Sequence, residues 1–296
     1  MAVARTSVSA TGLVGPGTCR LASRCTLTTG RQLPEGSMMT TLHAPRTDLD
    51  ALADSYDEQG YVLVKGLLSR EEAAALRTRS HELIAALDRG DDPTWDAAAG
   101  VAMGRATSLQ HLHDAQFYDA AFTRLLTDPR FTDVAAAVLR TSDVQLHHTK
   151  MFVKPPENGS PFPPHQDHPF FPHTHHRVAA AIFHFDDAPD TKGCVRIAPG
   201  SHREGPREHD PKGSYHLPDF PADELVPMEA EAGDVLFFTY LTVHSSGVNE
   251  SDEARTTWLV QFRDPADPPL TDQHTHSLGQ GLILAGSDPT GRAGQA

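Results

Sequence analysis

The sequence predicts a mainly β protein with flanking helices, in which two antiparallel sheets form a double-sheet barrel or jelly roll. After residue 141, short runs rich in β-branched and aromatic residues alternate with turns rich in Pro and Gly, and this punctuation is typical of such barrels. Before residue 141, apolar residues recur at helical spacing behind capping residues, which predicts an N-terminal helical region.

Composition limits the classes of partner. The chain has 296 residues, enough for one large domain or two small ones, and its 39 acidic and 25 basic residues give a net charge of −14. This charge would repel nucleic acid and anionic membranes, and no apolar stretch is long enough to span a bilayer. Three cysteines without a CxxC pair make no disulfide framework. We therefore expect a cytoplasmic protein that binds neither nucleic acid nor a membrane; its oligomeric state stays unknown.

The beginning of the chain differs from the rest. The first 34 residues contain four Arg and nine Ser or Thr but no acidic residue, a composition shared by transit peptides. Because no amphipathic helix accompanies it, we interpret residues 1–45 as a disordered tail or a misassigned start, with Met38 or Met39 as the true first residue. We expect the folded domain over residues 46–265 and a loose tail over residues 266–296, where Pro, Gly, Thr and Gln dominate.

Capping residues and apolar periodicity place the expected helices. Leu49, Leu52 and Tyr56 form one apolar stripe, and Gly60 is suited to end that helix. The segment Ser69-Arg70-Glu71-Glu72 matches a capping box, in which serine and glutamate satisfy free backbone N–H groups. In chain order we expect a helix over 48–59, a strand over 61–64, a helix from 69 to about 87, a loop over 88–104, and helices over 118–126 and 131–139.

The other expected strands all follow residue 141. Each is a short apolar run bounded by turn dipeptides such as Pro-Pro, Asn-Gly or Pro-Gly. We expect strands over 144–153, 178–185, 195–198, 235–243 and 256–262, with turns at 155–156, 158–159, 161–164, 199–200 and 232–234.

Histidine is the residue type that points to chemistry. The chain has 18 histidines, and fourteen lie between His111 and His244. On a strand, residues i and i+2 share a face, so a His-x-Asp pair presents an imidazole and a carboxylate together. With a distant third histidine this pair makes the two-histidine, one-carboxylate triad of non-haem iron oxygenases. Two such pairs occur, about the number expected by chance, so context must separate them.

The context favours His165-Gln166-Asp167. This pair follows a rigid Pro-rich turn over residues 161–164, which would place it at the mouth of a strand. The other pair, His184-Phe185-Asp186, ends a run that is typical of a core strand. We interpret His184 as a hydrogen-bonded structural residue and Asp186 as the start of a turn.

The third ligand should come from a later strand. The candidates are His202, His209, His216 and His244, and His244 alone ends a convincing predicted strand. Ser246 and Arg255 follow it. An arginine fork binds a carboxylate through two parallel hydrogen bonds, and a nearby hydroxyl can add another. This set suits an iron oxygenase that consumes a 2-oxo acid.

Several segments follow the order of one known family. They are Tyr56–Val64, Gly66–Ser69, Lys150–Pro156, His165–Asp167, Asp186–Ala188, Gly193–His202, Gly233–Leu236, His244–Ser246 and Arg255. On these motifs the chain resembles the phytanoyl-CoA dioxygenase family of Fe(II)/2-oxoglutarate oxygenases over about residues 48–262. The HQD, PGSH and HxS…R motifs are specific in combination, although each alone is common.

The resemblance implies a fold and a set of ligands. The fold is a double-stranded β-helix, a jelly-roll or cupin-like core with flanking helices. The cofactors are Fe(II), 2-oxoglutarate and O₂. Iron would be held by His165, Asp167 and His244, and 2-oxoglutarate by Arg255 and Ser246. Lys150 would add a polar contact to 2-oxoglutarate, or else be a solvated edge-strand lysine. The presence of the metal carboxylate argues against the related halogenases.

The implied activity is hydroxylation of a small organic molecule, with release of succinate and CO₂; specialised metabolism is one context for it. No side chain need act as nucleophile or general base. The same oxidising chemistry can instead give desaturation, epoxidation or ring closure. A non-catalytic metal-binding module on the same fold, or a cupin-type metalloenzyme that uses no keto acid, are further alternatives. Arg255 and Ser246 distinguish these from the leading hypothesis.

The substrate side is defined least. His168, Phe170 and Phe171 directly follow the metal pair, and we expect them to face the pocket, with core packing as the alternative for the phenylalanines. The basic segment 173–177, which contains His173, His175, His176 and Arg177, is interpreted as a solvated surface turn rather than a lid over an anionic substrate. No CoA-binding patch is evident.

Overall fold

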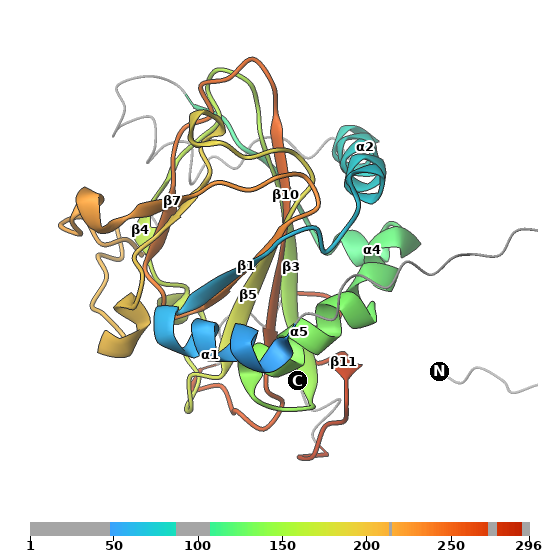
Figure 1. Cartoon of the computed structure of the whole chain (residues 1–296), viewed down its shortest axis with the longest axis vertical. Coiled ribbons are helices and arrows are strands. Elements are labelled where there is room, and N and C mark those ends of the chain that lie inside the picture. Colours follow the sequence, from blue (N-terminus) through green and yellow to red (C-terminus); the bar gives the residue numbers. More distant parts are fainter. Residues whose placement is uncertain (1–47, 87–106, 213–214, 272–276, 292–296) are drawn as a thin grey trace, which may run out of the picture. The chain divides into compact units, whose positions relative to one another are not determined.

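A computed structural model of the chain describes residues 48–86, 107–212, 215–271 and 277–291 (Figure 1). The tail expected over residues 1–45 and the loop expected over residues 88–104 lie outside these residues. Among the helices that the structure describes, none is long and apolar enough to cross a membrane.

The elements follow the predicted order, with helices before most of the strands. The helices are α1 (Leu49–Gln59), α2 (Arg70–Ala86), α4 (Ala120–Leu126) and α5 (Pro129–Leu139). The strands are β1 (Tyr61–Val64), β2 (Gln110–His113), β3 (Val144–Lys154), β4 (Phe162–His165), β5 (Val178–His184), β6 (Val195–Ile197), β7 (Val226–Met228), β8 (Val235–Thr239), β9 (His244–Ser246), β10 (Arg255–Arg263) and β11 (Ile283–Ala285).

The strands form two antiparallel sheets. The larger, seven-stranded sheet has the order β1-β8-β5-β10-β3-β11, with β2 also paired to β3. The smaller, four-stranded sheet has the order β4-β9-β6-β7. The helices α2, α4 and α5 lie on the opposite side of the large sheet from β4 and β7 (Figure 1). The predicted mainly β jelly-roll architecture with flanking helices is therefore confirmed.

Two apolar layers account for this arrangement, because alternate residues of a strand face opposite sides of its sheet. Between the helices and the large sheet, Phe131 of α5 packs its ring against Phe183, Phe237 and Phe262, with ring centroids 5.4–6.1 Å apart. Between the two sheets a smaller cluster contains Ala180, Val195, Ile197, Met228, Leu236 and Phe238. The second layer is thin and leaves space at one end for a polar site.

Capping fixes the first two helices as predicted. Asp48 accepts a hydrogen bond from the backbone N–H of Ala51, and Gly60 ends α1 with φ +80°. The capping box is formed in full: Ser69 Oγ accepts from the N–H of Glu72 at 3.1 Å, and Glu72 Oε2 accepts from the N–H of Ser69 at 2.7 Å.

The strand predicted over residues 235–243 was too long. β8 ends at Thr239, where the backbone turns through a hydrogen bond from the N–H of Thr242 to the carbonyl of Thr239. The Thr242 hydroxyl donates to the Gly60 carbonyl at 2.7 Å. His244 therefore begins β9 in the smaller sheet instead of ending a strand of the larger one.

The turn predicted over residues 161–164 is in fact mostly strand β4. Proline has no N–H to donate to a neighbouring strand, so it is tolerated in sheets mainly at edges. β4 contains Pro163 and Pro164 and is an edge strand of the smaller sheet, and β7, with Pro227, is the other edge.

The C-terminal segment was expected to be loose from residue 266. In the described part of this segment, β11 pairs with β3, and Asp267 is fully buried. The Asp267 carboxylate accepts hydrogen bonds from the N–H groups of His175 and Arg177. These contacts hold the segment against the rest of the domain. The composition of the segment did not show this, because the partners that order it are distant in sequence.

Phe131→Ala should destabilise the domain strongly, because it removes the ring that joins α5 to three strands. We expect a loss of about 3–5 kcal/mol in the free energy of unfolding, the usual range for such core truncations. Urea unfolding followed by circular dichroism measures it. Leu270→Ala, at a side chain that is 60% exposed, is the control and should change the stability little; an equal loss in both variants would contradict the packing role of Phe131.

Candidate metal centre

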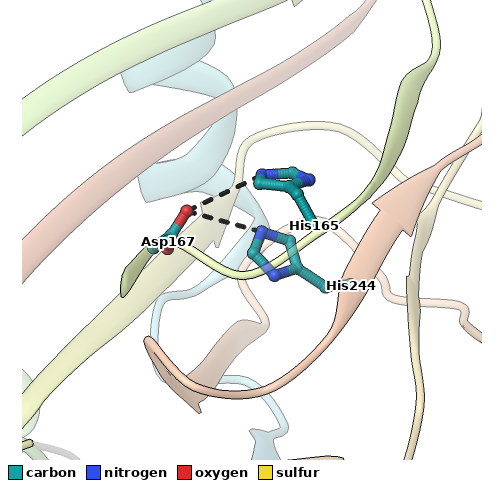
Figure 2. A group of neighbouring side chains, drawn as sticks. All are labelled: His165, Asp167 and His244. Atoms are coloured by element: carbon teal, nitrogen blue, oxygen red, sulfur yellow. Dashed lines mark ion pairs between the residues drawn. The ribbon is translucent and has the colours of Figure 1, made fainter. Parts of the chain in front are cut away.

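His165, Asp167 and His244 converge at one end of the space between the sheets (Figure 2). Both imidazoles present Nε2 to the same carboxylate oxygen: His165 Nε2 and His244 Nε2 each lie 3.7 Å from Asp167 Oδ1. The candidate ligand atoms of the three residues lie within 4.8 Å of one another. Of the other histidines weighed for this role, the structure brings none into the cluster of described residues.

The pairing of β4 with β9 positions the two imidazoles. His165 and His244 are direct cross-strand partners, so their side chains leave the same face of the smaller sheet. Their ring centroids are 4.2 Å apart. Asp167 follows β4 by two residues and immediately precedes the short 3-10 turn η2 (His168–Phe170), which returns its carboxylate toward the pair.

Backbone carbonyls fix the orientation of both rings. His165 Nδ1 lies 2.8 Å from the Pro163 carbonyl oxygen, and His244 Nδ1 lies 3.0 Å from that of Thr242. A carbonyl only accepts, so each Nδ1 carries the proton and each Nε2 keeps its lone pair for the centre. Burial, assisted by the neighbouring His244, lowers the pKa of His165 well below its ordinary value.

The cluster fits a divalent metal ion. Nitrogen and carboxylate ligands bind such ions at about 2.0–2.2 Å, so one ion can bridge donor atoms up to about 4 Å apart, and the observed 3.7 Å separations satisfy this limit. Two neutral imidazoles and one carboxylate on one side leave the remaining coordination positions open. These three residues can therefore hold iron(II) with room for further ligands.

Gln261 fixes the second carboxylate oxygen, a contact that the sequence analysis missed. Its side-chain amide donates to Asp167 Oδ2 at 2.6 Å, and Gln261 is 1% exposed. Asp167 thus directs one oxygen at the histidines and the other at Gln261. Strand parity places Gln261 on the same side of β10 as Arg255, but no pattern in the sequence shows its contact with Asp167.

A cavity of about 170 Å³ extends from this centre between the sheets. Alternate residues of β3 and β10 line one side of it, and β9 lines the other. The lining includes His148, Lys150 and Phe152 from β3, Arg255, Thr257, Leu259 and Gln261 from β10, and His244, Ser245 and Ser246 from β9.

Arg255 and Ser246 line the cavity, as the predicted co-substrate site requires. Arg255 is 3% exposed, and its Nη1 donates to the carbonyl of Gly193. Its Nε has no hydrogen-bond partner among the described residues, and no carboxylate of that set forms an ion pair with it. Burial lowers the pKa of the guanidinium to about 10. Arg255 is thus a buried cation with donors available for an anionic ligand.

Two lysines of β3 face the same side of that strand, and only the first was predicted. Lys150 is half-buried and lines the cavity, with its Nζ 5.0 Å from the centroid of the Phe152 ring. Lys154 is fully buried, and its Nζ donates to Ser246 Oγ at 2.7 Å and to the Gly247 carbonyl at 2.6 Å. The segment Lys150–Pro156 contains Lys154, but nothing in the sequence shows its contact with Ser246.

The predicted substrate residues do not share one location. Phe170 and Phe171 line the cavity, and Phe171 also stacks on Tyr240 with ring centroids 6.1 Å apart. His168 is absent from the lining; its ring lies 5.4 Å from that of Tyr240 and 5.5 Å from that of His176.

The basic segment 173–177 is tied to the protein at several points, which differs from the expected solvated turn. His173 is 1% exposed, and the ring nitrogen Nδ1 of His176 lies 2.7 Å from the Tyr240 hydroxyl. Arg177 forms an ion pair with Asp264 at 2.6 Å. His175 remains exposed, as expected.

The second His-x-Asp pair serves a structural purpose. Asp186 accepts from Arg77 Nε at 2.5 Å and from the N–H of Thr256 at 2.8 Å. His184 is fully buried, but neither ring nitrogen has a hydrogen-bond partner among the described residues, unlike the hydrogen-bonded histidine expected. Burial lowers the pKa of His184 to about 4, so the ring is neutral at ordinary pH.

The two sheets and the His-Asp-His cluster are those of Fe(II)/2-oxoglutarate oxygenases with a cupin-like jelly-roll fold. The family model described as phytanoyl-CoA dioxygenase (PhyH) matches residues 56–257. The chain belongs to this family.

Several proteins of known name are similar to this chain in sequence or in structure. The chain is 26% identical to phytanoyl-CoA dioxygenase domain-containing protein 1 of Danio rerio, over 73% of this chain and 91% of that one. It is 28% identical to ectoine dioxygenase of Bordetella bronchiseptica, over 70% and 73% of the two chains. Among solved structures, the epimerase SnoN in complex with Fe³⁺, alpha-ketoglutarate and nogalamycin RO has a TM-score of 0.65 and 25% identity, over 81% of this chain and 96% of that one.

Family, fold and site together establish the kind of reaction. This chain is an Fe(II)- and 2-oxoglutarate-dependent oxygenase that consumes O₂. An epimerase is among its structural neighbours, so the outcome for the substrate is not fixed by the fold.

Gly193→Ala should destabilise the segment that anchors Arg255. Gly193 has φ +64°, and an added Cβ would overlap the carbonyl oxygens of Gly247 and Val248. We expect a loss of about 1–3 kcal/mol in the free energy of unfolding, measured by urea denaturation. Gly66→Ala is the matched control, because Gly66 has φ +60° with open space around it. An equal loss in both variants would show that backbone conformation alone, and not the close approach, matters at Gly193.

Proposed function

We propose that His165, Asp167 and His244 bind the iron of this oxygenase. The observation that carries this assignment is that two Nε2 atoms each lie 3.7 Å from one carboxylate oxygen, with both Nδ1 atoms engaged by carbonyls. Gln261 holds Asp167 to one coordinating oxygen.

Arg255 and Ser246 bind the distal carboxylate of 2-oxoglutarate in this proposal. Both residues line the cavity that begins at the metal cluster. The guanidinium is buried and forms no ion pair in the described part of the chain, because Asp186, the carboxylate that acts on its pKa, pairs with Arg77. A buried cation is stabilised when an anion pairs with it. Lys150, which lines the same cavity, contributes a further polar contact to the co-substrate.

The substrate reaction we propose is hydroxylation of a small organic molecule. Bound Fe(II) and 2-oxoglutarate supply the oxidising chemistry, in which the keto acid is converted to succinate and CO₂ and O₂ provides the oxygen atom. The protein's own part is to hold ligands, exclude water and orient the substrate. Phe170 and Phe171 contribute an apolar wall to the cavity beside the metal cluster. His168, which lies outside that wall, would contact a substrate only at the rim.

Epimerisation, desaturation, epoxidation or ring closure is the alternative outcome. The similarity to SnoN, which is named as an epimerase, favours epimerisation among these alternatives. Product mass separates three groups of outcomes: hydroxylation and epoxidation add one oxygen, desaturation and ring closure remove two hydrogens, and epimerisation leaves the mass unchanged. Succinate release across a panel of candidate metabolites, followed by mass spectrometry, tests the substrate and the outcome together.

Arg255→Ala should weaken 2-oxoglutarate binding about 10- to 100-fold, the usual loss for charge-assisted hydrogen bonds. Anaerobic titration of 2-oxoglutarate into the Fe(II)-loaded protein, followed by the visible charge-transfer absorption, measures the affinity. Arg196→Ala is the control, because Arg196 pairs with Asp190 at 2.7 Å and does not line the cavity. His244→Ala should abolish the absorption. If the iron-loaded wild type shows no absorption, the proposal is wrong.

Gln261→Leu should weaken iron binding about 10-fold or more, because the ligand carboxylate loses the group that orients it. Isothermal titration of Fe(II) under nitrogen measures this. Gln145→Leu removes an equally buried glutamine from β3, whose amide donates to the Gly281 carbonyl at 3.3 Å, and should leave the affinity unchanged. Equal affinities for all three proteins would show that Gln261 does not position Asp167.

A further inference from the structure

Lys154 is a buried lysine to which no part of the proposed reaction assigns a role. It is the last residue of β3, is 0% exposed, and has no carboxylate partner among the described residues. A buried ammonium is costly unless hydrogen bonds or a counter-charge compensate it. Its hydrogen bonds to Ser246 Oγ and the Gly247 carbonyl account for part of that compensation.

The register of the large sheet places a second cation opposite it. Arg255, the first residue of β10, is the direct cross-strand partner of Lys154. Like charges directly opposite one another destabilise a sheet, and here both are buried. Burial and the Arg255 charge lower the pKa of Lys154 well below its ordinary value. An anion bound beside these two basic groups would favour the charged form of both.

The direction of the Lys154–Ser246 hydrogen bond determines what Ser246 can do. A hydroxyl has one donor and two acceptor positions, whereas a lysine ammonium, the form that a bound anion favours, only donates. Ser246 Oγ therefore accepts from Lys154 at 2.7 Å and keeps its own hydrogen for another partner. Ser246 lines the cavity, whereas Lys154 does not. The hydrogen is thus available on the cavity side, where Arg255 also lies.

We infer that Lys154 is a positioning residue for 2-oxoglutarate: it holds Ser246 as a hydrogen-bond donor toward the distal carboxylate and adds positive charge behind it. This inference rests on the proposed placement of 2-oxoglutarate at Arg255 and Ser246. Because Lys154 acts through Ser246, its effect should appear in the affinity for the co-substrate and not in the affinity for iron.

A double-mutant cycle tests this dependence. Lys154→Met keeps the length of the side chain but removes its donors and charge, and we expect it to weaken 2-oxoglutarate binding about tenfold. In a Ser246→Ala background, the same change should weaken binding less than about threefold, because the group that Lys154 orients is already gone. Anaerobic charge-transfer titration of the Fe(II)-loaded proteins gives the four affinities, and Fe(II) calorimetry without 2-oxoglutarate gives iron binding. The KM for 2-oxoglutarate should rise with little change in kcat.

Lys192→Met is the matched control. Lys192 is also a mostly buried lysine, but its Nζ pairs with Glu253 at 2.5 Å and contacts neither Ser246 nor the cavity. It should leave 2-oxoglutarate affinity within twofold of wild type. Lys154→Arg, which retains donors and charge, should recover part of the affinity. Lys154→Gln, which removes the charge and shortens the side chain, serves in place of Lys154→Met should that variant not fold.

The outcomes separate this inference from the proposed function. If Arg255→Ala binds 2-oxoglutarate normally, the proposed placement of the co-substrate is wrong. If Arg255→Ala loses binding while Lys154→Met, or Lys154→Gln in its place, binds like wild type, the role of Lys154 is overturned. Equal losses from Lys154→Met in the wild-type and Ser246→Ala backgrounds would also overturn it, because the lysine would then not act through Ser246.

Discussion

The antiparallel pairing of β4 with β9 is the constraint on which the rest of the site depends. It sets His165 opposite His244. The Pro163 carbonyl of β4 and the Thr242 carbonyl just before β9 orient the two rings, so that both Nε2 atoms face one point. The same short strand β9 carries Ser246 two residues after His244, and therefore on the same face. One edge of a small sheet thus supplies two candidate metal ligands and one candidate co-substrate ligand.

The large sheet completes the site from the opposite side through a second register. β10 pairs with β3 so that Arg255 faces Lys154 at one end of the strand pair and Gln261 faces His148 toward the other. Gln261 donates a hydrogen bond to Asp167, and Lys154 donates one to Ser246. Each end of the β3–β10 pair therefore orients a site residue that lies outside these two strands. The thin apolar layer between the sheets holds these two frameworks at a fixed separation.

Sequence reasoning found the residues whose chemistry is local and missed those whose role depends on register. His165 and Asp167 are neighbours, and capping signals such as Ser69 and Glu72 are read within four residues. By contrast, Gln261 and Lys154 acquire their partners 94 and 92 positions away, and no periodicity encodes such contacts. The prolines of β4 led to the prediction of a turn instead of a strand. Proline is tolerated in a strand at the edge of a sheet, and the sequence does not show which strands are edges. His244 was predicted as a ligand from a strand whose bounds were wrong, and the structure places it beside His165 and Asp167.

The net charge of −14 and the basic groups around the cavity act on different kinds of ligand. The net charge opposes binding to long polyanions, which interact with the whole surface. A compact dicarboxylate interacts mainly with the buried groups around it, and at the proposed co-substrate site these are Arg255 and, behind Ser246, Lys154. At short range in a site of low dielectric constant, such groups outweigh surface charges that water and salt screen. An acidic protein can therefore bind a dianionic co-substrate, provided that the cations it buries for this purpose are held in place by the strand register.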